Sequence, residues 1–526
     1  MDKGLRFITS LALAVTCVRL MTSDVVTSSM KIRRMVTEEK NLLLKLKSFI
    51  DNQIESIKNM SQFYADRRLE LLVEKATTNM TDLEHPNTIY HVIKKFVHQY
   101  GKALNENYDC FLKTIQKSTD VYLSEQPEIN EASMALLRLQ AVYNLTVTDM
   151  VDGDYLGYKG PALTSVDAVE LGVFALSAQD YLTSLDWLNA SITKHSDMTY
   201  TQTLLIELPT IAVLKALMGL VYLRIGKIDE AKHLYNESKM LDPKSFSLAE
   251  LEQQLLNPPD VEPVIERELT LSNYSRLCRQ RHQQFHQPPN DVRLVCRYRG
   301  TLLPYYRFQE ELLSISPFVS LIYKFTTDAE SEFFKSAVRN KLKKVEEPDS
   351  ADDSSITETR TGQVAYVEEN SSETARQLVD KIAHVTYLET SFQNGKKAVD
   401  SLQVVNYGLA GHFKVNNDSA TETLHRMLTF LIYLSDVKMG GATVFPQLGL
   451  SVTPVKNMAL MWYNLNTSHQ YETMTSHAAC PVLRGHKWIL TKLIIDQPNI
   501  FRRRCGLQPN VSQLEIEEDM KRRYRI

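Results

Sequence analysis

The chain has 526 residues, enough for roughly three or four domains of about 100–200 residues each. Apolar residues make up 43% of it, so it can form buried cores. Its 60 basic and 63 acidic residues give a net charge of −3 with no dominant basic stretch, which argues against a nucleic-acid-binding protein.

The first residues predict a secretory signal peptide. Lys3 and Arg6 precede a short apolar run from Phe7 to Val18, after which the chain becomes polar. This order is typical of a cleaved signal, and the run is shorter than the about 20 apolar residues that a membrane span needs. We therefore predict a signal peptide over residues 1–22 and no membrane span. The alternative is a buried N-terminal helix.

Sequons for N-glycosylation agree with entry into the secretory pathway. An N-x-S/T sequence is a surface acceptor in secreted proteins, and several together support this interpretation better than one. Such sequences begin at Asn59, Asn79, Asn144, Asn189, Asn236, Asn273, Asn370, Asn417, Asn466 and Asn510. We expect a glycoprotein.

Residues 29–65 have helical periodicity, with apolar residues such as Leu43, Leu46 and Ile50 at three- and four-residue steps. This pattern predicts a long amphipathic helix. It fits a coiled-coil contact between subunits or an ordinary helix in a bundle equally well. Residues 66–140 continue the helical pattern.

Two similar helical pieces lie in residues 165–245: "ELGVFALSAQDYLTSLDWLNASI" and "LMGLVYLRIGKIDEAKHLYNESKMLDP". Each has a small residue early, then a polar turn and a second helix, and they resemble tetratricopeptide repeats. Such pairs stack into a groove that can hold an extended peptide. The aromatic residues that could line it are Tyr181, Trp187 and Tyr222, and the alternative places these rings in the core between helices.

Six cysteines are present, and one leaves with the predicted signal. In an oxidising compartment neighbours in sequence would pair as Cys278–Cys296 and Cys480–Cys505. Cys110 then remains, either as a buried thiol or in a bond whose partner is not evident. No C-x2-C spacing indicates zinc.

From about residue 400 the apolar pattern changes to a period of two. Short strand-like stretches follow one another, separated by turn residues: "LQVVNYG", "TFLIYLSDV", "GGATVFP", "LSVTPV", "ALMWYNL", "HAACPVL" and "HKWILTKLII". Many short strands in close succession predict a double-stranded β-helix, or jelly roll. The fold class is therefore multidomain α + β, with helical regions first and this β domain last.

Three residues of the β region suit an oxygen-activating iron site. Such iron is often held by two histidines and one carboxylate, with open positions for a co-substrate and oxygen. Asp418 fits the carboxylate, and His477 fits a histidine from a distant strand. Lys487 lies in an apolar strand, where an unpaired ammonium is costly, so it fits the anchor for the far carboxylate of a 2-oxo acid.

The strings "LQVVNYGLAGHF", "YLSDVKMGGATVFPQLGLSVTP", "WYNL" and "SHAACPVLRGHKWILTK" resemble the catalytic domain of the collagen prolyl 4-hydroxylase alpha subunit, and the resemblance covers nearly the whole mature chain. It implies an Fe(II)- and 2-oxoglutarate-dependent dioxygenase of the endoplasmic reticulum lumen that uses O2 and ascorbate on proline of procollagen-like peptides. It also implies an α2β2 assembly of two alpha subunits with protein disulfide isomerase.

The resemblance sets the expected domain order. We expect the signal peptide (1–22), an N-terminal helical dimerisation domain (23–143), a tetratricopeptide-like peptide-substrate domain (144–250), a linker with a disulfide loop (251–320), the dioxygenase domain (321–500) and a C-terminal tail (501–526).

The match departs from the family at one iron ligand. The family has a histidine two residues before the aspartate, and this chain has Asn416 there. An amide oxygen is a weaker donor than imidazole, and His412 is too far along the strand to replace it, so we expect it at the surface. Two functions therefore stay open: a proline 4-hydroxylase, or a catalytically impaired paralogue that binds proline-rich peptide or assists assembly.

Overall fold

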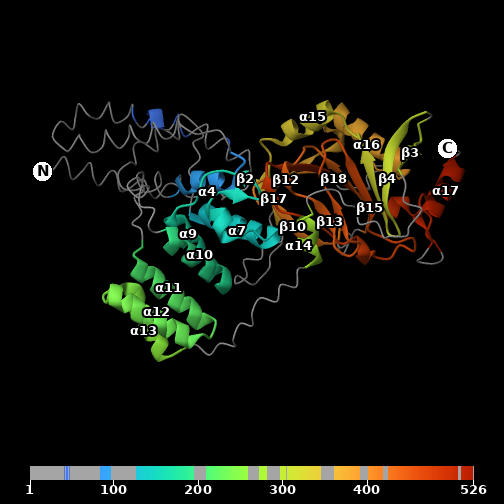
Figure 1. The fold of residues 1–526 in the computed structure, drawn as a ribbon. Coiled ribbons are helices and arrows are strands. Elements are labelled where there is room, and N and C mark those ends of the chain that lie inside the picture. The colour runs from blue at the N-terminus through green and yellow to red at the C-terminus, as the bar shows by residue number, and fades with distance from the viewer. Residues whose placement is uncertain are drawn as a thin grey trace, which may run out of the picture. The chain divides into compact units, whose positions relative to one another are not determined.

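Figure 1 shows a computed structural model of the chain. It describes isolated positions between 33 and 47, then residues 83–95, 97, 126–194, 209–258, 272–280, 296–303, 305–344, 360–390, 401–418, 425–506 and 511–524. The predicted signal peptide, most of the predicted helix over 29–65, and Cys110 lie outside the described residues. The chain forms two compact units, Met1–Thr270 and Leu271–Ile526.

The first unit is mainly helical. Its elements are α4 (Pro86–Lys94), α7 (Gln126–Tyr143), α8 (Val147–Val151), β1 (Asp154–Tyr155), β2 (Tyr158–Lys159), α9 (Ser165–Ser177), α10 (Tyr181–Lys194), α11 (Ile211–Arg224), α12 (Ile228–Leu241) and α13 (Phe246–Leu256). The strands β1 and β2 form a two-stranded antiparallel hairpin. No helix among the residues given above has the length and hydropathy needed to cross a membrane.

Helices are present at both predicted pairs, as α9 with α10 and α11 with α12. The small residues noted in the sequence let neighbouring helices approach closely. A Cβ added at Gly172 would lie 3.0 Å from Cγ of Leu188, and one at Gly219 would lie 2.6 Å from Cδ2 of Leu251. Thr164 begins α9 through a capping box with Asp167.

The second unit contains two large antiparallel sheets. The nine-stranded sheet has the order β3-β4-β5-β15-β11-β18-β9-β8-β6, the five-stranded sheet has the order β14-β13-β16-β10-β7, and β12 pairs with β17. The strands are β3 (Cys296–Gly300), β4 (Arg307–Ile315), β5 (Phe318–Tyr323), β6 (Lys343–Lys344), β7 (Arg360–Thr361), β8 (Gln363–Val367), β9 (Leu402–Tyr407), β10 (His412–Asn416), β11 (Arg426–Tyr433), β12 (Met439–Gly440), β13 (Thr443–Phe445), β14 (Leu450–Val452), β15 (Ala459–Tyr463), β16 (His477–Ala479), β17 (Val482–Arg484) and β18 (Lys487–Ile495).

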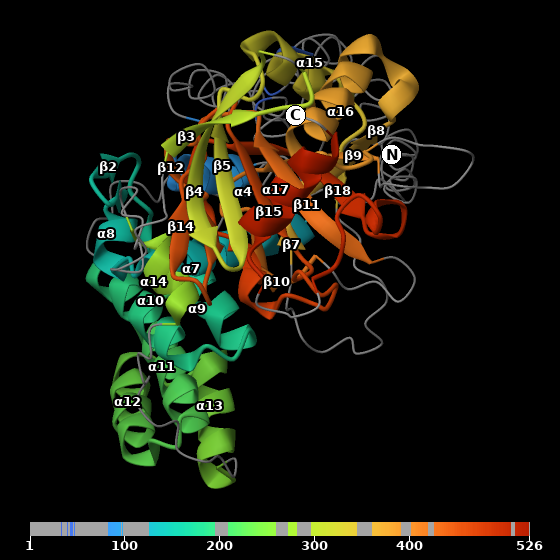
Figure 2. The same ribbon diagram turned by 90° about the vertical axis from the view of Figure 1, so that its right-hand side faces the viewer.

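The helices of this unit are α14 (Asn273–Cys278), α15 (Asp328–Val338), α16 (Glu373–Thr386) and α17 (Gln513–Tyr524), with short 3-10 helices at Glu369–Ser371, Thr473–Thr475 and Gln497–Asn499. Figures 1 and 2 show α15 and α16 side by side, and α15 packs on β8 and β9.

Both faces of the central strands are buried. In β15, Leu460 and Trp462 enter the core shared with strands of the five-stranded sheet, together with Phe445 of β13. On β11, Leu431 enters this core, whereas the ring of Phe430 packs against that of Phe325 in a tilted arrangement, with the ring centroids 4.8 Å apart. The strands predicted from residue 402 onward are confirmed, and their inward-facing residues surround the site described below.

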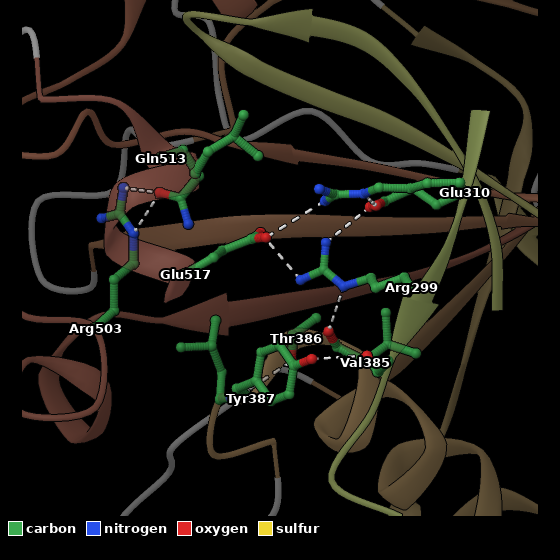
Figure 3. Close-up of polar contacts among 12 residues, drawn as sticks. Arg299, Glu310, Val385, Thr386, Tyr387, Arg503, Gln513 and Glu517 are labelled. Atoms are coloured by element: carbon green, nitrogen blue, oxygen red, sulfur yellow. Dashed lines mark hydrogen bonds and ion pairs between the residues drawn. The ribbon is translucent and has the colours of Figure 1, made fainter. Parts of the chain in front are cut away.

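The sheet begins earlier than the sequence indicated. β3 and β4 lie in the range assigned to a linker, yet both belong to the nine-stranded sheet. The range assigned to a tail contains α17, which meets β3 through a buried ionic network, shown in Figure 3. Arg299 donates to Oε1 of Glu310 at 2.7 Å and to Oε1 of Glu517 at 3.0 Å. Arg297 donates to Oε2 of Glu310 at 2.7 Å.

The predicted cysteine pairs are wrong. Cys278 is bonded to Cys480, with their Cα atoms 5.6 Å apart, and Cys296 and Cys505 are free and exposed. Cys278 ends α14, which packs on β13 and β14, where Oγ of Ser451 donates to the Leu277 carbonyl at 3.2 Å. Packing of this short helix therefore selects a partner 202 residues away over a neighbour in sequence.

Candidate functional site

Strand register brings the two halves of the predicted site together. β10 and β16 are antiparallel neighbours, and Asn416 lies directly opposite His477. Asp418 follows the end of β10, and its Oδ2 lies 3.6 Å from Nε2 of His477. The two residues that the sequence indicated as metal ligands, 59 positions apart in the chain, therefore adjoin.

Two residues that sequence reasoning missed hold the Asp418 carboxylate. Thr429 of β11 donates from Oγ1 to Oδ2 of Asp418 at 2.7 Å. Asn464 donates from Nδ2 to the same threonine oxygen at 2.8 Å, which directs the threonine proton toward the carboxylate. The signal in the sequence was a single threonine within the largely apolar stretch "MLTFLIYL". A buried polar group in such a strand needs a partner.

The tautomer of His477 is set by the hydrogen bond that its ring nitrogen Nδ1 makes. Nδ1 lies 3.3 Å from the Thr475 carbonyl, which can only accept, so Nδ1 carries the proton. The lone pair of Nε2 then points to the Asp418 side, as in metal-binding histidines. The rings of Trp462 and Phe445 lie 4.6 Å and 5.9 Å from the imidazole and make this part of the site apolar.

The Asn416 amide can take two orientations. In one, Nδ2 lies 3.3 Å from Oδ1 of Asp418, but the amide oxygen then faces two backbone carbonyl oxygens. In the other, Nδ2 donates to the His477 carbonyl at 2.9 Å and to the Lys414 carbonyl at 3.1 Å. The second is favoured because it makes two hydrogen bonds and removes the contacts of the amide oxygen with the two backbone carbonyls, although it gives up the hydrogen bond to Oδ1 of Asp418. The side-chain oxygen of Asn416 then faces Asp418.

Lys487 is buried without a carboxylate. Its side chain on β18 is 1% exposed, and Nζ donates to Oγ1 of Thr443 at 3.1 Å. The rings of Tyr407 and Tyr433 lie 5.9 and 5.7 Å from Nζ. Burial lowers the pKa of Lys487 to about 7. No salt bridge to this ammonium occurs within the described part of the chain.

The predicted site residues share one cavity of about 370 Å³, here called the site cavity. It lies between the two sheets of the second unit. Its lining includes Arg360, Gln403, Tyr407, Phe413, Asn416, Asn417, Asp418, Arg426, Thr429, Leu431, Thr443, Trp462, His477, Lys487 and Thr491. The structure thus brings together Asp418, His477 and Lys487, as the sequence indicated.

The site cavity offers a small set of possible donors to a divalent cation. Within the described ranges no group of three or more His, Cys, Asp or Glu side chains is found. Asp418 and His477 nevertheless supply one carboxylate and one imidazole on the same side of the site cavity, and the favoured amide orientation adds a carbonyl oxygen. These groups fit a divalent metal ion, with two of the three donors of the usual iron site.

His412 differs from the expectation of a surface residue. It is 4% exposed, on β10 opposite Thr361, and it does not line the site cavity. Its position agrees with the conclusion that it does not replace Asn416.

The predicted peptide-binding role of Trp187 is wrong. This ring is fully buried, and its Nε1 donates to Oε1 of Gln140 at 2.9 Å, so it belongs to the core between α10 and α7. Tyr181 and Tyr222 are partly buried and pack against the two helical core clusters, so their predicted contact with peptide stays a prediction.

Comparison with known proteins covers both units. Residues 28–157 match the family described as prolyl 4-hydroxylase alpha-subunit, N-terminal region, and residues 402–494 match the 2OG-Fe(II) oxygenase superfamily. Prolyl 4-hydroxylase subunit alpha-1 of Bos taurus is 27% identical over 520 residues, which are 90% of this chain and 94% of the relative. Subunit alpha-2 of Gallus gallus is 28% identical over 517 residues, 90% of this chain and 93% of the relative.

Solved structures give a more distant likeness. The viral collagen prolyl hydroxylase of Paramecium Bursaria Chlorella virus-1 is 19% identical with a TM-score of 0.27, and the match covers 34% of this chain and 95% of that one. A Pseudomonas putida prolyl-4-hydroxylase is 15% identical with a TM-score of 0.25, over 34% of this chain and 91% of that one. The full-length relatives and the two matched regions show that this chain is similar to prolyl 4-hydroxylase alpha subunits along 90% of its length.

Proposed function

We propose that the protein is a procollagen-proline 4-hydroxylase alpha subunit, which hydroxylates peptidyl proline with O2 and 2-oxoglutarate at an Fe(II) site in the site cavity. Asp418 and His477 hold the metal. When bound, Fe(II) activates O2 together with a 2-oxo acid. The similarity to prolyl 4-hydroxylase alpha subunits supplies the reaction class, and ascorbate enters the proposal from the same resemblance.

The unpaired Lys487 ammonium is the observation that carries this proposal. A buried ammonium is costly without an anionic partner, and burial has already lowered its pKa to about 7. The far carboxylate of 2-oxoglutarate would restore the charge by pairing with Nζ, beside the hydroxyl of Thr443. The metal-binding pair lies in the same cavity, where the 2-oxo end of the co-substrate must sit.

The surrounding residues prepare the two ligands. Thr429 and Asn464 fix the carboxylate of Asp418, and the Thr475 carbonyl fixes the proton of His477 on Nδ1. The rings of Trp462 and Phe445 keep water from one side of the imidazole. Such supporting contacts typically change metal affinity or activity by about 10–100-fold.

The substrate and partners complete the proposal. The helical pairs of α9–α12 would form the tetratricopeptide-like substrate domain within residues 144–250, and Tyr181 and Tyr222 would contact a proline-rich peptide. The β unit would be the jelly roll of the dioxygenase domain. Two such chains would assemble with protein disulfide isomerase in the endoplasmic reticulum lumen.

A second candidate function rests on Asn416. Because this residue stands where the family has histidine, the chain could serve as a catalytically impaired subunit that binds proline-rich peptide or assists assembly. In that case the helical unit would keep its peptide affinity although the site cavity does not turn over.

One assay separates the two functions. The full chain, expressed with protein disulfide isomerase, is incubated anaerobically with Fe(II), then given O2, 2-oxoglutarate, ascorbate and a (Pro-Pro-Gly) repeat peptide. Mass spectrometry measures 4-hydroxyproline, and succinate is measured in parallel. We expect both products in the native protein and neither in Asp418→Ala. A native protein that binds the peptide but forms no hydroxyproline would establish the second function instead.

A further inference from the structure

We propose that the side-chain oxygen of Asn416 is the third protein ligand of the metal, and that this changes which metal the site prefers. The site would bind a divalent cation through one imidazole nitrogen and two oxygens, and its selectivity would move from Fe(II) toward Mn(II). This inference deepens the proposed function, because it rests on the metal site that the function requires.

Backbone hydrogen bonds hold the amide. In the favoured orientation Nδ2 donates to the carbonyls of His477 and Lys414 at 2.9 and 3.1 Å. These carbonyls belong to two paired strands, β16 and β10, so the amide is fixed from both sides. Turning it away from Asp418 would exchange both hydrogen bonds, each worth about 0.5–1.5 kcal/mol, for one longer hydrogen bond of 3.3 Å to Oδ1 of Asp418. The oxygen is therefore held toward the metal ligands rather than free to rotate.

Three electron-rich atoms then converge. In the favoured orientation the Asn416 oxygen takes the place of Nδ2, 3.3 Å from Oδ1 of Asp418. No hydrogen atom lies between these two oxygens. On the other side, the lone pair of His477 Nε2 faces Oδ2 of Asp418 at 3.6 Å. This arrangement is repulsive unless a positive charge lies among the three atoms.

The lysine and arginine side chains described around the site cavity form no ion pair with the Asp418 carboxylate. Arg426 donates to the backbone carbonyl of Asp418 at 3.4 Å rather than to its carboxylate. Among the described residues, no lysine or arginine forms a salt bridge with this carboxylate, which accepts from the Thr429 hydroxyl. A bound cation would balance the three donors, in place of a proton on Nε2 of His477.

The donor types determine the preference. Imidazole suits Fe(II), Co(II) and Zn(II), whereas carboxylate and carbonyl oxygens suit Mg(II), Ca(II) and Mn(II). Exchanging one imidazole for an amide oxygen should therefore weaken binding of Fe(II) and its analogue Co(II) more than binding of Mn(II). The affinity ratio of Co(II) to Mn(II) reports this directly and needs no turnover.

Metal titration of the full chain without 2-oxoglutarate tests the inference. The loss of the free Mn(II) EPR signal gives one affinity, and visible absorption of bound Co(II) gives the other. Asn416→Ala removes the ligand and should lower Mn(II) affinity about tenfold or more. Asn416→His should raise Co(II) affinity about 10–100-fold, with a smaller change for Mn(II). Equal affinities for native protein and Asn416→Ala would overturn the inference.

Asn417 provides a matched control. It lines the same cavity, but its Nδ2 donates to the Glu472 carbonyl at 3.1 Å. Asn417→Ala should keep both metal affinities. Asp418→Ala should lose them, and circular dichroism checks that each variant is folded. The outcomes are distinguishable: unchanged binding in Asn416→Ala with hydroxyproline still formed defeats this inference alone, whereas the expected metal affinities without hydroxyproline defeat only the proposed function.

Discussion

Lys487 and Arg299 are both buried cations in the second unit, and their surroundings are opposite. Arg299 is held by the carboxylates of Glu310 and Glu517 (Figure 3). Burial alone would lower the pKa of Arg299, but Glu517 and Glu310 outweigh it, and the pKa is raised. Lys487 has a hydroxyl and two rings but no carboxylate, and burial lowers its pKa to about 7.

The difference separates a structural charge from a binding charge. Lys492 lies on the same strand as Lys487, and it is paired with Glu369. In the first unit, Lys94 pairs with Asp167 at 2.6 Å. A buried cation that already has its anion fixes elements of the fold to each other. A buried cation that lacks one, inside a cavity with two metal-binding side chains, is suited to an anion that arrives with the substrate.

The largest expected effect is a loss of stability when the paired cation Arg299 loses a carboxylate partner. Glu517→Ala leaves the Arg299 guanidinium buried with one of its two carboxylate partners, and breaking a buried pair costs about 3–5 kcal/mol. We therefore expect the unfolding transition of the second unit to move to lower denaturant concentration, followed by tryptophan fluorescence. Glu518 is exposed on the same helix, so Glu518→Ala should stay within about 0.5 kcal/mol of native. Similar stabilities for the two variants would contradict a structural role for the network.

Lys487→Met should give the reverse pattern. Because Lys487 has no carboxylate partner that would be left unpaired, this change should leave the stability of the ligand-free protein unchanged or raised. Affinity for 2-oxoglutarate, measured by isothermal titration calorimetry with Mn(II) present, should fall by at least about 30-fold, because losing one partner of a buried charge pair costs about 2–5 kcal/mol.

Lys492→Met is the control for that variant. It leaves Glu369 without its ammonium, so it should lower stability and spare 2-oxoglutarate affinity. If Lys487→Met instead behaves like Lys492→Met, the two lysines are equivalent and the distinction between structural and binding charges is lost.

A smaller effect on metal affinity is expected when the hydrogen bond to the Asp418 carboxylate is removed. Thr429→Val keeps the shape but removes the donor to Asp418 and the acceptor for Asn464. We expect metal affinity to fall by about 10–100-fold in the Mn(II) titration. Thr491 lines the same cavity and takes no part in these hydrogen bonds, so Thr491→Val should bind metal like the native protein. A loss in both variants would mean that cavity shape, rather than the hydroxyl, supports the carboxylate.

The pH dependence of 2-oxoglutarate binding should show the smallest effect. Because the pKa of Lys487 is about 7 without ligand, the ammonium loses its proton above that pH, and the co-substrate carboxylate loses its partner. Affinity should therefore fall as pH rises above 7, by at most about tenfold per pH unit. Lys487→Arg, whose guanidinium stays protonated, should bind with little change over the same range. A flat profile in the native protein would contradict the unpaired ammonium.

The same lowered pKa has a consequence for stability, with a definite sign. The folded protein binds fewer protons at Lys487 than the unfolded chain does between the folded pKa of about 7 and the ordinary value of 10.5. The contribution of Lys487 to stability should therefore increase with pH across that window. Comparing native protein with Lys487→Met isolates this contribution, which should vanish in the variant.

Local pattern was enough for much of the fold and for part of the site. The period of two placed β9, β11 and the strands from β13 to β18, but not β10 or β12, and early small residues with polar turns placed the helix pairs from α9 to α12. Asp418, His477 and Lys487 were identifiable because an iron site and its co-substrate anchor need those side-chain types. Each of these features depends on residues close together in the chain or on the chemistry of a single side chain.

Tertiary structure decided what depends on contacts between distant segments. The bond from Cys278 to Cys480, the burial of Trp187 against Gln140, and the support of Asp418 by Thr429 all cross between elements. So do the Arg299 network and the orientation of the Asn416 amide. Sheet register and helix packing choose these partners among many chemically similar residues, and neither periodicity nor side-chain type specifies that choice.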